Sequence, residues 1–162
     1  MMDFADFGIA GAEKSEWFHL KSPADEPFYM QDDQTISTKK TDKPCRILLR
    51  GVAEPEVVAA LEKIPHIARV YQWKEKRAKD KDLPALAEAE DRDYREAVKK
   101  LMQVAIQDWE NIAYDGEVRA YNTENLLLMF TRTENPRSGR MFQTVYDELT
   151  RRRDFFPSAA GN

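Results

Sequence analysis

The sequence predicts an α+β fold that is mainly α, with a small N-terminal antiparallel sheet followed by a helical C-terminal region. Two observations predict it. Residues 1–51 alternate short β-forming runs with turn formers, which is typical of hairpins. In residues 52–162, apolar residues recur three and four positions apart, which indicates amphipathic helices. Since 162 residues correspond to about one domain, we expect the two regions to form one compact unit.

Three short strands are expected in the N-terminal region. Residues 17–20 (Trp-Phe-His-Leu) and 28–30 (Phe-Tyr-Met) flank a Ser-Pro-Ala-Asp turn, so they can pair as a hairpin. Residues 45–50 (Cys-Arg-Ile-Leu-Leu-Arg) are mostly apolar and precede Gly51, which predicts a third strand. Such a small sheet needs helices packed on it to be stable.

Five helices are expected in the C-terminal region. Pro55 suits the first turn of the first helix, and Pro65 predicts a break or kink at its end. Asn122 or Thr123 can cap the fourth helix, and Asn135 can cap the fifth. The predicted helices cover residues 55–64, 66–80, 84–109, 123–131 and 136–154.

Trp109 is expected to close the long third helix. Leu101, Met102 and Ala105 lead up to it at helical spacing, so we expect Trp109 to be buried against the core. Residues 110–122 then form a connector, in which the Asp115-Gly116 pair supplies a turn because these residue types accept a positive φ.

Composition argues against several classes of function. Charged residues make up 33% of the chain and the net charge is −4, so the whole-molecule field does not favour nucleic acid or anionic membrane. The single cysteine excludes an intrachain disulfide and a thiolate metal cluster. No apolar run reaches the roughly 18 residues of a transmembrane helix. Residues 1–11 contain no Lys or Arg, so we expect no secretory signal and a protein that stays in the cell that makes it.

Few residues could carry catalysis. His19 and His66 are the only histidines, and neither has a neighbour at metal-ligand spacing, so we expect no metal and no cofactor. Cys45 is interpreted as a buried strand cysteine, although an enzyme built on this chain would have to use Cys45 or a histidine. The sequence has no glycine-rich phosphate-binding pattern. We therefore expect a protein that is not an enzyme.

The segment Lys74–Lys81 could instead be a nucleic-acid-binding element. Its cations follow Tyr71 and Trp73, and this combination could bind phosphates and stack bases. Acidic residues interleave with the lysines and cancel most of the field, which favours a solvated helix or linker. A nucleic-acid-binding regulator that uses this segment therefore remains the alternative, and nucleic acid is not the expected partner.

The C-terminal region has a more specific order of residues than its composition requires. Trp109 and Ile112 are followed by Asp115-Gly116, then by a Tyr-Asn-Thr-Glu-Asn-Leu run at 121–126, and Phe155-Phe156 lie near the end. This order resembles that of the tail assembly chaperones of long-tailed bacteriophages and prophages, which carry glycine where this chain has Asn111. The runs at 17–20, 27–29 and 46–51 are also similar to that family.

The resemblance implies a non-catalytic assembly factor in the host cytoplasm that is absent from the mature virion. It implies that the chain binds the tape measure protein, keeps this long helical client soluble and recruits tail tube subunits. Self-association is compatible with it, and a membrane partner is not expected. A different phage structural or connector protein is a further alternative. A chaperone for an amphipathic helix needs an apolar groove with a charged rim. The candidate contact residues are Tyr71, Trp73, Tyr94, Trp109 and Tyr121.

Overall fold

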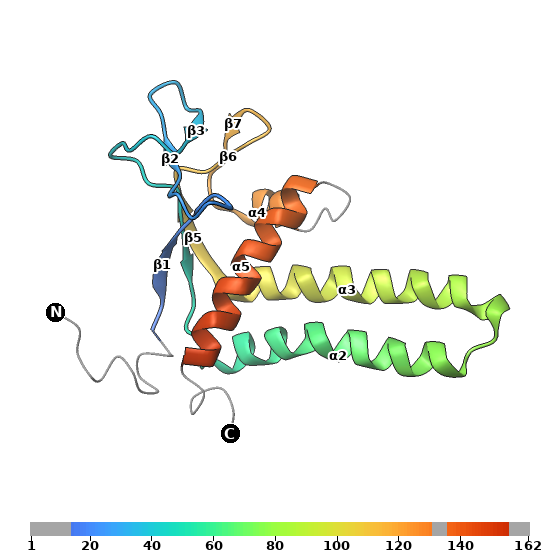
Figure 1. Cartoon of the computed structure of the whole chain (residues 1–162). Helices are drawn as coiled ribbons and strands as arrows, with labels where there is room; N and C mark the ends of the chain where they lie inside the picture. Colours follow the sequence, from blue (N-terminus) through green and yellow to red (C-terminus); the bar gives the residue numbers. More distant parts are fainter. Residues whose placement is uncertain (1–13, 131–135, 156–162) are drawn as a thin grey trace.

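A three-stranded antiparallel sheet lies at one end of a long helical hairpin (Figure 1). The computed structural model describes residues 14–130 and 136–155. The sheet contains β1 (Glu16–His19), β4 (Arg46–Leu49) and β5 (Ile106–Glu110) in the order β1-β4-β5. Ile47 and Leu49 in the central strand are fully buried, while Arg46 and Leu48, which alternate with them, are half-buried. This alternation directs one face of the strand into the core.

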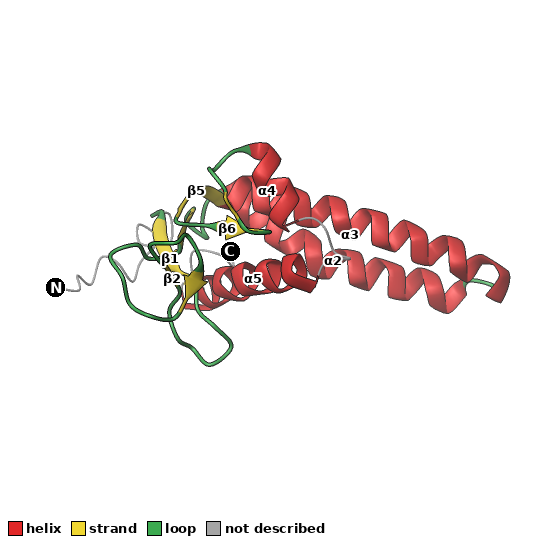
Figure 2. Cartoon of the chain, turned by 90° about the horizontal axis from the view of Figure 1, so that it is seen from above, coloured by secondary structure: helices red, strands yellow, loops and turns green. Residues whose placement is uncertain are grey.

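The helical hairpin consists of α2 (Pro55–Arg77) and α3 (Leu83–Ala105), joined through the short 3-10 helix η2 (Asp80–Asp82). Seen from above, the two helices run side by side and extend away from the sheet (Figure 2). Two more helices, α4 (Thr123–Phe130) and α5 (Pro136–Phe155), pack at the base of the hairpin. The predicted fold class, α+β and mainly α, is therefore confirmed.

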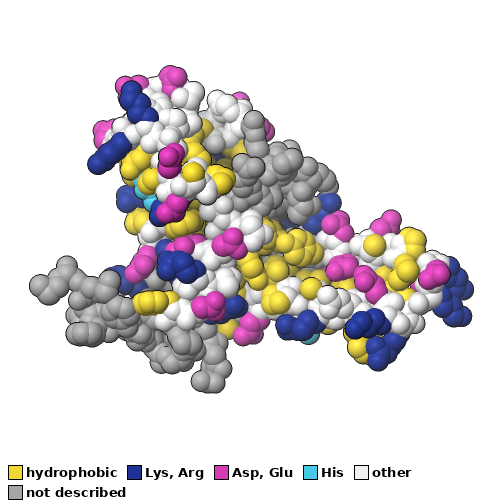
Figure 3. Space-filling view, in the orientation of Figure 1, with side chains coloured by type: hydrophobic (Ala, Val, Ile, Leu, Met, Phe, Trp, Pro, Cys, Tyr) yellow, Lys and Arg dark blue, Asp and Glu magenta, His cyan; other side chains and the backbone are white. Residues whose placement is uncertain are grey.

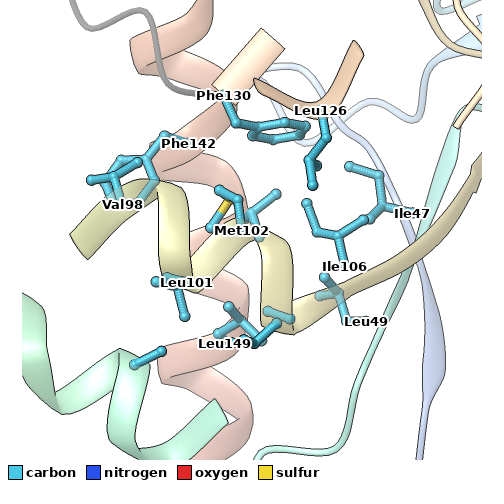
Figure 4. Close-up of a cluster of buried hydrophobic side chains, with 14 of the residues drawn as sticks. Ile47, Leu49, Val98, Leu101, Met102, Ile106, Leu126, Phe130, Phe142 and Leu149 are labelled. Carbon is cyan, nitrogen blue, oxygen red and sulfur yellow. The ribbon is translucent and has the colours of Figure 1, made fainter. Parts of the chain in front are cut away.

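One core joins the sheet to the helices. Ile47 and Leu49 come from the sheet, Leu101 and Met102 from α3, and Leu149 from α5, and all are fully buried and lie close together (Figure 4). Full burial of each such side chain contributes about 1.5–3 kcal/mol before entropy is counted. The small sheet is thus covered by helices, as its size requires.

Two short ribbons complete the fold. The first pairs β2 (Tyr29–Met30) with β3 (Ile36–Ser37), and the second pairs β6 (Ala113–Tyr114) with β7 (Glu117–Val118). The predicted hairpin between residues 17–20 and 28–30 is wrong as a strand pairing. Its turn closes through the bridge between Lys21 and Pro27, but β1 then pairs along its length with β4. The alternating apolar face of β4 gives β1 a better partner than the short, partly polar second run.

The end of the predicted helix 84–109 is a strand. α3 stops at Ala105, and residues 106–110 form β5, which pairs with β4 so that Ile47 faces Trp109 across the ladder. The Arg46 side chain forms an ion pair with Glu110 at 2.7 Å across the same two strands. Pairing with β4 overrides the helical spacing, because sheet context decides short apolar runs. The sheet is therefore not confined to the N-terminal region.

Pro65 does not end a helix. The predicted helices 55–64 and 66–80 are one continuous helix, α2, with Pro65 in its interior. A proline removes one backbone hydrogen bond. Buried Ile64, Ile67 and Tyr71 pack the helix on both sides of that gap, which holds it straight enough to continue. The predicted fourth and fifth helices match α4 and α5 to within one residue.

Asn122 caps α4, because its side-chain oxygen accepts a hydrogen bond from the backbone N–H of Asn125 at 2.8 Å. The predicted cap Asn135 and the residue Phe156 lie outside the described residues.

Candidate functional site

The segment that carries the family resemblance is a closed structural unit. The Trp109 indole N–H donates to the carbonyl of Arg119 at 2.7 Å, and the Tyr121 hydroxyl donates to the carbonyl of Ile106 at 2.6 Å. The rings of Trp109 and Tyr121 meet edge to face, with centroids 5.2 Å apart. These contacts tie β5 to the start of α4, so both aromatic side chains stabilise the connector.

The turn inside this unit uses two left-handed residues. Asp115 and Gly116 have φ of 52° and 79°, which is the pattern of a two-residue hairpin between β6 and β7. Asn111 also has a positive φ, 55°, and its side-chain amide donates to the carbonyl of Pro44 at 2.9 Å. Asparagine is the residue type after glycine that most readily accepts this conformation. The departure from the family pattern at this position is therefore physically conservative.

An apolar groove lies on the helical hairpin where it leaves the rest of the molecule. The groove has a floor of aliphatic side chains, one aromatic wall from α5 and carboxylates at its edge. Figure 3 shows hydrophobic side chains gathered in this part of the molecule. It is lined by Ile64, Pro65, Ile67 and Ala68 of α2, Ala87, Glu90, Asp91 and Tyr94 of α3, and Tyr146 of α5.

The aromatic residues of the groove are held by their neighbours. The Tyr94 ring meets Phe142 edge to face at 6.3 Å, and Phe142 contacts Tyr146 at 5.6 Å. Burial, followed by the nearby Tyr146, raises the pKa of Tyr94, so its hydroxyl is neutral at ordinary pH. The wall of the groove is thus preformed and offers apolar surface with phenolic tips.

The edge of the groove is acidic. Burial first, and then a hydrogen bond and charge from Glu75, raise the pKa of Glu90, so one carboxylate from each helix meets at this edge. Asp91 is paired with Arg95 at 2.9 Å. An apolar floor with a carboxylate edge suits a helix that has an apolar stripe flanked by basic residues.

The five predicted contact residues do not form one site. Tyr71 and Trp109 are each only 5% exposed, and the Tyr71 hydroxyl donates to Asp93. Tyr121 is half-buried in the connector. Tyr94 lines the groove, whereas Trp73 is 57% exposed on α2. The predicted burial of Trp109 is confirmed, in a strand rather than at a helix end.

Of the nine residues that line the groove, sequence reasoning named only Tyr94 as a contact residue. Among those it missed, Ala68, Ala87 and Tyr146 lie on three different helices, and only the packing of those helices brings them together. The two alanines are exposed and each precedes a charged residue, so hydrophobic spacing does not single them out. Small residues on facing helices were the one available signal, since they leave room between the two backbones.

Three residues were candidates for catalysis: Cys45, His19 and His66. Cys45 is 2% exposed, and burial raises the pKa of its thiol to about 11, which makes it a poor nucleophile. A ring nitrogen of His19 lies 2.7 Å from the carbonyl of Phe28. His66 is exposed on α2. Within residues 14–130 and 136–155, no group of three or more His, Cys, Asp or Glu side chains could hold a metal ion.

No described helix is both long enough and apolar enough to cross a bilayer. Comparison of the chain with protein families, with curated proteins and with solved structures finds no match. Its function therefore has to be argued from the groove, the surface and the sequence pattern.

Proposed function

We propose that the protein is a phage tail assembly chaperone that works by contact and catalyses no reaction. Its client is the tape measure protein, which it keeps soluble, and it brings tail tube subunits to that client in the host cytoplasm. The observation that carries the proposal is the apolar groove on the α2–α3 hairpin, with its floor at Ile64 and Ala68 and its acidic edge at Glu90. The resemblance of residues 109–126 to this family supports the same assignment.

The hairpin is suited to a helical client because of its length. Each of its helices has 23 residues, which corresponds to about 35 Å of rise. An amphipathic helix laid in the groove would form a third member of a bundle and cover its own apolar stripe. Long helical chains aggregate when such stripes are exposed, so covering them keeps the client in solution.

Co-expression with the tape measure protein of the same phage tests the proposal. The wild-type chain should raise the soluble fraction of the client and co-purify with it. Ala87→Arg puts a long cation into the groove and should abolish both effects. Ala85→Arg is the matched control, because Ala85 is exposed on the same helix outside the groove, and it should behave as the wild type. A client that stays insoluble beside the wild-type chain would overturn the proposal.

Two alternatives make different predictions. A nucleic-acid-binding regulator that uses Lys74–Lys81 would retain DNA at moderate salt; its weakness is that Tyr71 is buried, which leaves Trp73 as the one exposed ring beside the lysines. A structural or connector protein would remain in purified virions, where mass spectrometry would find it. The chaperone would bind no DNA and would be absent from virions.

A further inference from the structure

The solvent-facing side of α2 carries a basic stripe that the groove does not use. Its residues follow each other at three- and four-residue spacing and end in an adjacent pair, so they lie on one side of the helix, opposite buried Ile64, Ile67 and Tyr71. We call this set the outer stripe. It consists of Glu62, His66, Arg69, Trp73, Lys76 and Arg77, all of them exposed. The stripe spans about 22 Å along the helix.

A shallow hollow lies beside the first turns of the stripe. Lys63, His66 and Arg69 line it from α2, and Arg153 lines it from α5. The acidic groups here are Glu62, which lines the hollow, and Asp154, which lies 3.6 Å from Arg153. The hollow is therefore a place where cations from two helices converge.

Several cations of the stripe and of the hollow have no ion-pair partner in the part of the chain that the structure describes. The ion pairs among the described residues do not include Lys63 in the hollow, or Arg69, Lys76 and Arg77 in the stripe. A chain with a net charge of −4 has enough carboxylates to neutralise this face, yet it leaves the face basic. An anionic partner would supply the missing countercharges.

Trp73 is the apolar element of the stripe. Its side chain is 57% exposed, and the Arg77 guanidinium covers one side of the indole at 4.1 Å from the ring centroid. The guanidinium also donates to the carbonyl of Trp73 at 3.3 Å, so ring and cation are held together. Tryptophan and arginine are two of the residue types enriched among those that dominate binding energy at protein interfaces. Figure 3 shows further Lys and Arg side chains at the free end of the hairpin.

We propose that the outer stripe is a docking surface for an acidic amphipathic helix of a partner protein. Carboxylates of that helix occupy the hollow at Lys63 and Arg69 and continue to Lys76, and an apolar side chain packs on the open side of Trp73. The straight stripe matches the length of about four turns of a partner helix. This surface is separate from the groove, and the proposal does not depend on the identity of the groove's client.

The chemistry of the stripe favours a protein helix over nucleic acid. Nucleic-acid surfaces without base readout rely on several stacked rings. Tyr71 cannot supply a second ring, because it is buried and its hydroxyl is bonded to Asp93.

The test uses the full chain and a fluorescent synthetic peptide of about 18 residues, which matches the stripe in length. The peptide has leucines at three- and four-residue spacing and glutamates elsewhere. Anisotropy should report saturable binding that weakens as salt rises, because screening reduces the attraction between the charges. Trp73→Ala should weaken binding about tenfold or more, and Trp73→Phe should retain most of it, because phenylalanine keeps an aromatic surface.

Matched charge reversals test the face itself. Arg69→Glu with Lys76→Glu should abolish binding, whereas Arg92→Glu with Lys100→Glu makes the same change in net charge on exposed positions of α3 and should leave it intact. Ala87→Arg in the groove should also leave peptide binding intact, which separates this result from the test of the chaperone proposal. Absence of peptide binding, equal losses in both reversal pairs, or tighter binding of single-stranded DNA than of the peptide would each overturn the inference.

Discussion

Two aromatic pairs, one in the segment 106–126 and one on the α2–α3 hairpin, have opposite environments. In the segment 106–126, Trp109 and Tyr121 contact each other, and the indole N–H and the phenol hydroxyl each donate to a backbone carbonyl. On the hairpin, Trp73 is exposed and Tyr94 lines a groove. An aromatic residue whose apolar surface and polar tip are both satisfied within the chain contributes to stability. One that keeps open surface is available to a partner.

The largest expected effect on stability is at Trp109. Trp109→Ala removes a buried indole, its hydrogen bond to Arg119 and its contact with Tyr121. We expect a loss of about 3–5 kcal/mol in the free energy of unfolding, measured in urea. Trp73→Ala is the hairpin counterpart and should change stability by less than about 0.5 kcal/mol, since its side chain is exposed. Equal losses for the two variants would contradict the comparison.

Pro65→Ala should stabilise the protein. The substitution restores the backbone hydrogen bond that proline removes from the middle of α2. The gain should be about 1–3 kcal/mol, reduced from the full proline penalty because the helix already accommodates the ring. Thermal melts monitored by circular dichroism would measure it. A destabilised variant would show that Pro65 contributes more through its contacts in the groove than it costs in the helix.

Substitutions of Asn111 in the connector should reduce stability by a smaller amount than Trp109→Ala. Asn111→Ala would place a methyl side chain at a φ of 55° and remove the hydrogen bond to Pro44, at a cost of about 1–2 kcal/mol. Asn111→Gly loses the same hydrogen bond but accepts the backbone conformation, so it should cost less. If chemical denaturation ranked glycine as the worse of the two, backbone conformation would not be what selects asparagine here.

The contributions of Glu148 and Glu90 to stability should change with pH in opposite directions, and these are the smallest effects that we expect. Burial raises the pKa of Glu148, but hydrogen bonds from Arg151 and Arg152 outweigh burial and leave that pKa lowered. The stability from Glu148 is therefore present above its unfolded pKa and lost as pH falls through the folded value. For Glu90, whose pKa is raised chiefly by burial and by Glu75, ionisation costs stability as pH rises.

Replacing each of these two carboxylates by an amide at neutral pH, and measuring the free energy of unfolding, compares them directly. Glu90→Gln should stabilise the hairpin, whereas Glu148→Gln should destabilise the protein. Urea midpoints at pH 7 and near pH 4 would show both effects shrinking in acid, because Glu90 gains a proton in the folded chain and Glu148 gains one first in the unfolded chain. If both substitutions changed the free energy of unfolding in the same direction at neutral pH, the environments assigned to Glu90 and Glu148 would be wrong.

Sequence reasoning reached most elements of the fold, and its errors have local causes. Strand β4 is predictable from its short apolar run, α4 from its cap and apolar body, and α5 from Pro136 and its apolar spacing. The spacing predicts helix for residues 106–109 because Trp109 continues the pattern of Leu101 and Ala105. The partner strand, about 60 residues earlier in the chain, makes this segment a strand instead. The predicted helix break at Pro65 is wrong for a similar reason, because the packing on both sides of Pro65 that lets α2 continue is a tertiary effect.

The candidate site was less predictable than the fold. Tyr94 could be named as an aromatic residue on a helix, but its place in a groove depends on α2 and α5 as well as on its own helix. The basic residues of α2 looked like a mixed-charge segment in sequence. Their gathering on one side of the helix follows from helical spacing together with the buried side of α2.

Hydrogen–deuterium exchange on the complex with the tape measure protein tests the central claim most directly. Backbone amides within residues 64–72 and 86–96, which line or flank the groove, should exchange more slowly in the complex than in the free chain. Amides of residues 106–121 should be unchanged, because the aromatic residues of the connector are satisfied within the chain. Protection confined to the connector, with the hairpin unchanged, would contradict the account.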